Sequence, residues 1–224
     1  MSNMRQFGMA FAMYRTDNDD TWMPAACPSD LGPNFAPQQI WVGYDNDNFG
    51  LDGGFYGHVY EPATHPARPG AIDLYVKNDA VKRCPEMPTS WQLAMALNWW
   101  TPDNVSDYYA RNPKAQGNEF GPASKITGTW TDGQLYASGA NDSEVDEPSN
   151  TLVLWEHLAR VPLCNFLQSW DWFDSPPNDQ SLRDHFHFLH RSGSNTVWAD
   201  GHARRMIYGQ LRRPMFSCNK AIYQ

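Results

Sequence analysis

The first segment with a regular pattern of apolar and polar positions covers residues 3–16. Its apolar side chains recur at intervals of three and four residues: Met4, Phe7, Phe11 and Tyr14. That spacing places them on one face of an α-helix. A run of Asp and Asn over residues 17–20 follows, and because these residues favour turns, it predicts the end of the helix. We therefore expect a helix whose apolar face lies against a sheet.

Two segments in the second half of the chain predict β-hairpins. In each, an Asp-Gly pair separates two short runs that suit strands, and a two-residue Asp-Gly connection is a strong hairpin signal. The pairs are Asp132-Gly133, between residues 127–130 and 134–138, and Asp200-Gly201, between residues 195–199 and 202–208. We expect Gly201 to adopt the positive φ that such a turn requires.

The remaining segments complete a coarse map of the chain. Residues 151–157 are a strongly apolar run that predicts a central strand, and residues 184–190 alternate as another strand. Residues 91–100 suit a strand or a short helix, and residues 71–83 suit a short helix or a turn. Proline and glycine punctuate residues 24–70, which predicts long irregular loops with short strands. One helix packed on a mainly antiparallel sheet gives an α+β fold.

Composition narrows the classes of partner. The formal net charge of −8 disfavours nucleic acid and anionic membrane surfaces, because both require a basic surface on the protein. No run approaches the roughly 18 consecutive apolar residues of a membrane span. The one basic cluster, which we interpret as a solvated edge or a salt-bridged return of the tail, is Arg204, Arg205, Arg212 and Arg213.

Four cysteines are spread along the chain: Cys27, Cys84, Cys164 and Cys218. None forms a Cys-x-x-Cys pair, which disfavours a thiolate zinc knuckle or a thioredoxin-type centre. An even number permits two disulfides, with three connectivities, in an oxidising compartment. Free buried thiols are the alternative.

Histidines provide the sharpest candidate chemistry. Five of the seven lie in the last third of the chain: His157, His185, His187, His190 and His202. His185 and His187 share a strand face by their spacing. We expect His190, Asp200 and His202 to meet around the second hairpin, where imidazole and carboxylate suit zinc or another divalent ion. The alternative is a metal-free hydrogen-bond network that fixes the turn.

Two further segments are candidate ligand sites. Asp45, Asp47 and Asp52 place oxygen ligands in one loop, which suits calcium, although the pattern does not match an EF-hand. The alternative is a plain loop of Asx turns. Trp170 and Trp172 suit an aromatic platform for a sugar, or an anchored loop.

Motifs for nucleophilic catalysis are missing from the sequence. It contains no Gly-x-Ser-x-Gly elbow, no phosphate-binding glycine loop and no dinucleotide fingerprint. The spacing of the acidic residues singles out no glycosidase pair. The sequence therefore favours a role other than catalysis, without deciding it.

The segment HRSGSNTVWADGHARRM holds His190, nine residues, and then Asp200-Gly201. It resembles the C-terminal signature of prepilin-type, pseudopilin-like proteins of planctomycetes and related bacteria. Three other segments resemble parts of this family in the same order. SNMRQFGMAFAMYRTDNDDTWMP resembles the helix that follows the membrane span, LYVKNDAVKRCPEMP the Tyr-Val-Lys-Asn … Cys-Pro segment, and EPSNTLVLWEH the Pro-Ser-x-Thr strand ending in an acidic residue, here Glu156.

The resemblance implies a pilin-like fold, in which residues 1–20 are the C-terminal half of the pilin-type helix and residues 21–224 the globular head. It implies an exported subunit of a type II secretion or type IV pilus-like filament, outside the cell, on its surface or in the periplasm. Its expected partners are other pilin-like subunits and a polysaccharide, not nucleic acid. Contact with a membrane is expected only through an N-terminal helix that family members have and this sequence lacks. The alternative is an exported metal-dependent hydrolase or carbohydrate-active protein that uses the His-rich C-terminal third.

Overall fold

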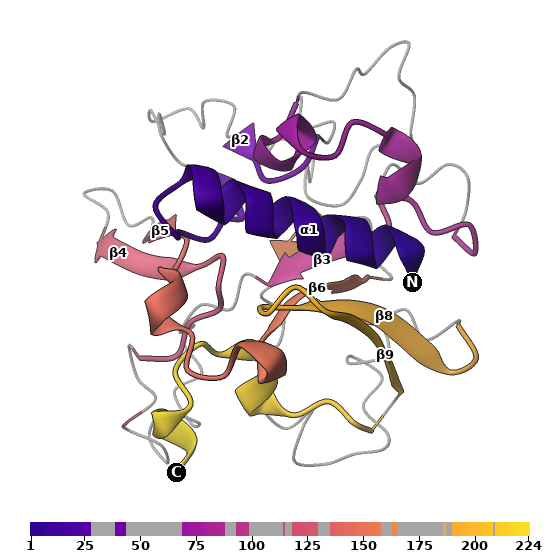
Figure 1. Ribbon diagram of the computed structural model, residues 1–224. Helices are drawn as coiled ribbons and strands as arrows, with labels where there is room; N and C mark the ends of the chain where they lie inside the picture. Colours follow the sequence, from indigo (N-terminus) through magenta and orange to yellow (C-terminus); the bar gives the residue numbers. More distant parts are fainter. Residues whose placement is uncertain are drawn as a thin grey trace.

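One α-helix and a mainly antiparallel sheet form the core of the computed structural model, which confirms an α+β fold (Figure 1). The structure describes residues 1–27, 39–43, 69–87, 93–98, 114, 118–129, 135–157, 163–164, 186, 190–207 and 209–224. The helix is α1 (Ser2–Asp17). The strands are β1 (Ala26–Cys27), β2 (Gln39–Ile40), β3 (Met95–Asn98), β4 (Lys125–Thr129), β5 (Leu135–Ser138), β6 (Leu152–Glu156), β7 (Leu163–Cys164), β8 (Gly193–Trp198) and β9 (Ala203–Ile207).

The main sheet has the strand order β7-β3-β6-β8-β9. Strands β3, β6, β8 and β9 pair antiparallel, and β7 runs parallel to β3. Strand β6 occupies the centre with every residue buried, which confirms the central strand predicted over residues 151–157. Two smaller pairs, β1-β2 and β4-β5, stand apart from this sheet. The antiparallel β4-β5 pairing confirms the first predicted hairpin partnership, whose turn lies outside the described residues.

Helix α1 lies on the main sheet by the predicted apolar face (Figure 1). Met4, Phe7 and Phe11 are buried, and Tyr14 is half-buried at the edge of the same core. The rings of Phe7 and Phe11 both contact Trp41, with centroids 6.0 and 6.1 Å away. The helix ends at Asp17, within the Asp-rich run that predicted its end. The predicted buried face of the helix is thus confirmed for Met4, Phe7 and Phe11, whereas Tyr14 is only half-buried.

The second hairpin differs from the expected two-residue connection. Strand β8 ends at Trp198, and the Trp198 N–H donates to the His202 carbonyl (3.0 Å), which leaves a three-residue loop. The Gly201 N–H donates to the Trp198 carbonyl (2.8 Å), and Gly201 has φ +88°. A turn closed by a left-handed glycine is the usual form of a three-residue hairpin loop. The predicted positive φ is confirmed, whereas the predicted loop length is wrong.

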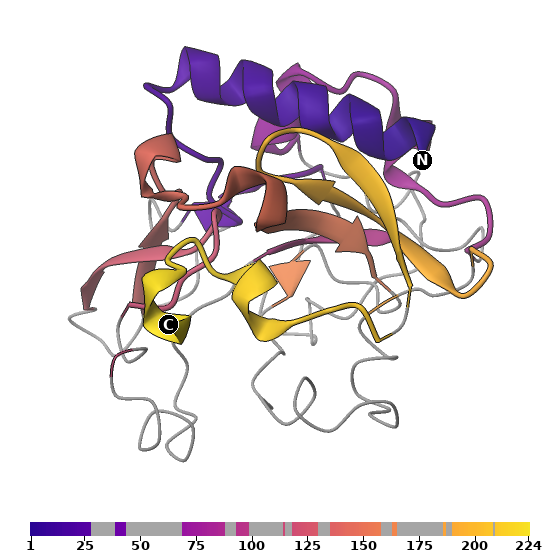
Figure 2. The same cartoon turned by 60° about the horizontal axis from the view of Figure 1, so that its bottom comes forward.

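A second apolar cluster covers the other face of the sheet. Its largest members are Trp155, Phe186, Trp198 and Phe216. The segment carrying Phe216 crosses this face, so the sheet lies between α1 and the C-terminal part of the chain (Figure 2). Burial on both faces explains why residues 152–155 of β6 are continuously apolar instead of alternating.

The short elements agree with the sequence in part. Residues 71–83 contain two 3₁₀ turns, η2 (Ala71–Leu74) and η3 (Asp79–Lys82), as the short-helix alternative predicted. Within residues 91–100, Met95–Asn98 form strand β3, as the strand alternative predicted. Of the strand predicted over 184–190, only Phe186 and His190 are described, and His190 lies in a turn. In the part of the chain that the structure describes, no helix has the length and apolarity to span a membrane.

Candidate metal site

Three side chains from distant parts of the sequence converge at one end of β6 and β8. Cys84 follows η3, Glu156 is the last residue of β6, and His190 precedes β8. His190 Nε2 lies 3.1 Å from Cys84 Sγ and 3.0 Å from Glu156 Oε1. All three potential ligand atoms lie within 4.8 Å of one another, so the Cys84–Glu156–His190 group could hold a metal ion. Thiolate, carboxylate and imidazole are all ligands of zinc.

The carboxylate of Glu156 is fixed by Asn195, from the neighbouring strand. The Asn195 backbone N–H donates to Oε2 (2.7 Å), and its side-chain amide donates to Oε1 (3.0 Å). Both residues are buried, with Glu156 only 5% exposed. Donors of this kind set the orientation of the carboxylate.

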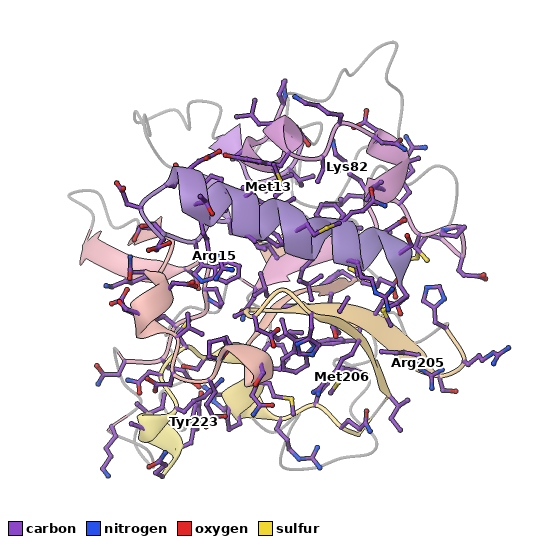
Figure 3. The ribbon with its side chains drawn as sticks, in the orientation of Figure 1. Met13, Arg15, Lys82, Arg205, Met206 and Tyr223 are labelled. Carbon is purple, nitrogen blue, oxygen red and sulfur yellow. The ribbon has the colours of Figure 1, made fainter. Side chains whose placement is uncertain are left out.

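The backbone at His190 forms a tight turn. The His190 N–H donates to the Gly193 carbonyl (3.2 Å), and the Gly193 N–H donates back (3.0 Å). Between them, Arg191 and Ser192 have φ of 50° and 63°, a conformation that side chains other than glycine rarely adopt. Arg205 on β9 donates from Nη1 to the carbonyls of His190 (3.1 Å) and Arg191 (3.2 Å), and its labelled side chain lies at this end of β9 (Figure 3). A strained turn held in this way fixes where the His190 ring can lie.

Cys84 is protonated in this environment when no cation is present. Burial raises the pKa of its thiol to about 11, and the negative charge of Glu156 acts in the same direction. A thiol of this kind is a poor nucleophile, because the thiolate is the reactive form. A bound metal ion would reverse this, since coordination deprotonates a thiol outright.

The geometry also argues against a Cys-His-Glu catalytic relay. In a relay, one ring nitrogen faces the nucleophile and the other faces the carboxylate. Here a single nitrogen, His190 Nε2, lies about equally close to Cys84 Sγ and Glu156 Oε1. The three atoms therefore converge on a common point, as ligands do.

Asp200 and His202 form a separate pair at the other end of β8. The Asp200 carboxylate accepts from the backbone N–H of His202 (3.0 Å) and contacts its ring, which stacks on Trp198 at 5.7 Å. Partial burial alone would raise the pKa of Asp200, but the hydrogen bonds from His202 outweigh it and the pKa is lowered. This pair matches the metal-free network that was the alternative for the turn.

The expected single site of His190, Asp200 and His202 is therefore wrong. Among the described residues, the group of metal-ligand type containing His190 includes neither of the other two. The nine residues between His190 and Asp200 contain the whole of β8, a strand of six residues. Such a strand spans about 20 Å, so its two ends cannot share one ion.

Several predicted residues lie outside the described part of the chain: His185, His187, Asp45, Asp47, Asp52, Trp170 and Trp172. The calcium loop and the sugar platform therefore remain predictions. Cys84 and Cys218 are free and buried, which rules out the arrangement with two disulfides.

The basic cluster near the C-terminus has mainly structural contacts. Arg213 is buried and makes a two-pronged ion pair with Glu119, at 2.7 Å for each hydrogen bond. Arg204 stacks over the Trp198 ring at 4.0 Å. The salt-bridged return of the tail is thus confirmed for Arg213, while Arg204, Arg205 and Arg212 line a pocket of about 520 Å³.

Sequence reasoning found His190 but did not assign Cys84 or Glu156 to a site. A signal was present, because each of the three residues lies in a different segment of the family resemblance: the Cys-Pro segment, the strand ending in an acidic residue, and the His-Asp-Gly signature.

Comparison of the chain with protein-family models, with curated proteins and with solved structures finds no match.

Proposed function

We propose that this chain is a pilin-like structural subunit of a type II secretion or type IV pilus-like filament, exported to the cell surface or periplasm. The observation that carries the proposal is helix α1, which packs on the antiparallel sheet by one face and exposes methionines on its other face. The four segments that resemble pseudopilin-like proteins support it. They include the helix itself and the β8-β9 hairpin beneath it.

The outer face of α1 provides the surface for assembly. Met9 and Met13 are 61% and 55% exposed and lie one helical turn apart, with Met13 visible on the helix in Figure 3. Leu74, in the η2 turn that contacts α1, is 70% exposed. Burying such side chains against a second helix is favourable by about 25 cal/mol for each Å² of apolar surface. Methionine adapts its shape to a partner more readily than branched residues do. The occupant we propose is α1 of another copy of this chain.

Cysteine cross-linking tests this proposal in the cell that produces the protein. A Met13→Cys variant should give disulfide-linked dimers after mild oxidation, because neighbouring copies of α1 would bring the introduced thiols together and each thiol can form one disulfide. Ala221→Cys is the matched control, since Ala221 is exposed in η7 (Ala221–Tyr223), on the opposite side of the molecule from α1 (Figure 2). The chain without an added cysteine is oxidised alongside. A Met13→Cys chain that stays monomeric under these conditions contradicts the proposal.

The alternative of a metal-dependent hydrolase has weaker support. Cys84 is 6% exposed and Glu156 is 5% exposed, so solvent reaches little of either residue, whereas the side chain of His190 is 25% exposed. Catalytic zinc sites keep one position open to water and substrate, whereas structural sites are closed. The burial of the group therefore favours a structural role.

A further inference from the structure

The Cys84–Glu156–His190 group brings three side chains of metal-ligand type together, and two of them, Cys84 and Glu156, are buried. Glu156 is buried, and Asn195 holds its carboxylate by two hydrogen bonds. A buried carboxylate is costly unless a positive charge or hydrogen bonds compensate for it. Two arrangements suit the contacts of His190 Nε2: a ring N–H that donates to Glu156 beside the Cys84 thiol, or a divalent cation bound by all three side chains.

The arrangement of atoms favours the cation. A ring N–H needs only Glu156 as its acceptor, yet the same nitrogen of His190 also lies 3.1 Å from the sulfur of Cys84. In a tetrahedral zinc site, neighbouring N, O and S ligands lie about 3.3–3.6 Å apart, as follows from zinc–ligand bonds of about 2.0–2.3 Å. The observed separations of 3.0 and 3.1 Å are a few tenths of an ångström shorter, so a small outward shift of each side chain would admit the ion.

Charge and ligand type identify the cation. A thiolate and a carboxylate carry two negative charges, and a neutral imidazole adds none, so a divalent ion leaves the buried group neutral. Calcium and magnesium prefer oxygen ligands alone, whereas a set of one sulfur, one nitrogen and one oxygen suits zinc. Asn195 holds the carboxylate as outer residues hold ligands in metal sites.

We propose that Cys84, Glu156 and His190 bind a zinc ion that fastens the segment after η3 to the adjacent ends of β6 and β8. On binding, the Cys84 S–H bond breaks, the proton leaves to solvent and a sulfur–zinc bond forms. The three side chains provide three of the four ligands of a tetrahedral zinc site. The site does not depend on filament assembly, so either proposal can fail without the other.

Zinc titration of the whole chain tests the site. After treatment with a chelator and dialysis, added ZnCl₂ should load about one ion per chain. It should raise the melting temperature by about 5–10 °C once zinc is about 100-fold above its Kd. Cobalt(II) in place of zinc should give the near-ultraviolet absorption of a thiolate–cobalt bond. Chelator should reverse both effects.

Matched variants assign the ligands. Cys84→Ser should abolish the thiolate–cobalt absorption and weaken zinc binding at least about 100-fold, while Cys218→Ser, at the other described buried free cysteine, should leave both unchanged. His190→Ala should lose zinc binding, and His202→Ala should retain it. Asn195→Ala keeps all three ligands and should weaken zinc binding by about 10–100-fold.

Three results would overturn the site: loading well below one zinc per chain, a melting temperature that zinc does not change, or cobalt absorption that persists in Cys84→Ser. The first two use the unaltered chain, so they decide the question even if a variant fails to fold. If zinc has no effect while His190→Ala still lowers the melting temperature, the group is a metal-free hydrogen-bond network.

Discussion

The backbones of helix α1 and the second hairpin approach each other closely at Gly8 and Gly201. A Cβ atom added to Gly8 would lie 2.3 Å from the carbonyl oxygen of Gly201, which is backbone and cannot swing away. The helix can therefore lie on this turn only with glycine at position 8. Gly201 has φ +88°, so this contact uses a glycine on each side: Gly8 because there is no space for a Cβ atom, and Gly201 because of its backbone conformation.

Gly8→Ala should destabilise the protein by about 1–3 kcal/mol, the usual cost of overpacking a well-packed contact. Helix propensity alone predicts the opposite, because alanine is favoured over glycine inside a helix by about 0.8–1.0 kcal/mol. Urea unfolding followed by circular dichroism measures the free energy of unfolding. Thr16→Ala, at an exposed position of the same helix, serves as control and should stay within about 0.5 kcal/mol. A stabilised Gly8→Ala protein would show that the helix does not approach the turn closely.

Glu144 provides a residue-scale test of electrostatics. It lies in η4 (Asp142–Glu144), accepts a hydrogen bond from the Asn141 N–H (2.9 Å) and pairs with Lys125. Partial burial alone would raise its pKa, but Lys125 and the Asn141 N–H outweigh that effect and the pKa is lowered. A lowered pKa means that the folded state binds fewer protons than the unfolded state near the ordinary pKa. Its stabilising contribution is therefore present above about pH 4.3 and lost as pH falls through the folded-state pKa.

Glu144→Gln should accordingly cost about 0.5–1 kcal/mol at pH 7, and the cost should fade as the pH falls below about 4. Unfolding of both proteins across this pH range gives the difference directly. In a Lys125→Met background the same substitution should cost less, because the charge that lowers the pKa is gone. A cost that does not change with pH would assign the role of Glu144 to its shape instead of its charge.

At the scale of elements, patterns within one segment predicted well. The stripe of α1 and the apolar run of β6 depend on periodicity and burial, which a local window contains. The turn at Gly201 was predicted because its chemistry is also local. The length of the loop in that hairpin was not predicted correctly, because two- and three-residue loops both accept Asp-Gly and the register of the strands decides between them.

The candidate site was the element-scale prediction that failed. It placed His190 with Asp200 because both belong to one short signature, yet the signature spans a whole strand and its ends point to different neighbours. The actual partners of His190 are 106 and 34 residues away in the chain. Bringing them together depends on β6 pairing with β8 and on the placement of the segment after η3, which no local pattern encodes.

Phe11→Ala tests how far the packing of α1 stabilises the fold. The Phe11 ring contacts Phe7, Trp22 and Trp41, at centroid distances of 6.4, 6.0 and 6.1 Å. Truncation should cost about 3–5 kcal/mol, because it removes a buried ring and leaves a cavity. Met13→Ala, on the exposed face of the same helix, should change the free energy of unfolding by less than about 0.5 kcal/mol. Equal effects at the two positions would mean that the helix does not dock by this face.

At the scale of the whole molecule, the C-terminal segment that carries Phe216 covers the face of the main sheet opposite α1. Asn98 on β3 donates to the carbonyls of Leu152 (2.7 Å) and Phe216 (2.8 Å), which ties this segment to two strands of the sheet. The Lys220 ammonium donates to the carbonyls of Asn150, Pro214 and Ser217. The Arg213–Glu119 pair adds a buried link to the middle of the chain. The fold thus depends on contacts between segments about a hundred residues apart.

Arg213→Met should be strongly destabilising, by about 3–5 kcal/mol, because it leaves the buried carboxylate of Glu119 without its cation. The Tyr223 hydroxyl also donates to Glu119, but a neutral donor does not replace the charge. The double variant Arg213→Met with Glu119→Leu should recover most of that loss, since it removes both charges and fills the space with apolar atoms. Thermal and urea unfolding of the two variants beside the original chain provide the comparison. If the single variant unfolds like the original chain, the pair contributes no net stability. If the double variant is as unstable as the single one, the cost comes from lost packing, and the C-terminal segment is held by shape instead of charge.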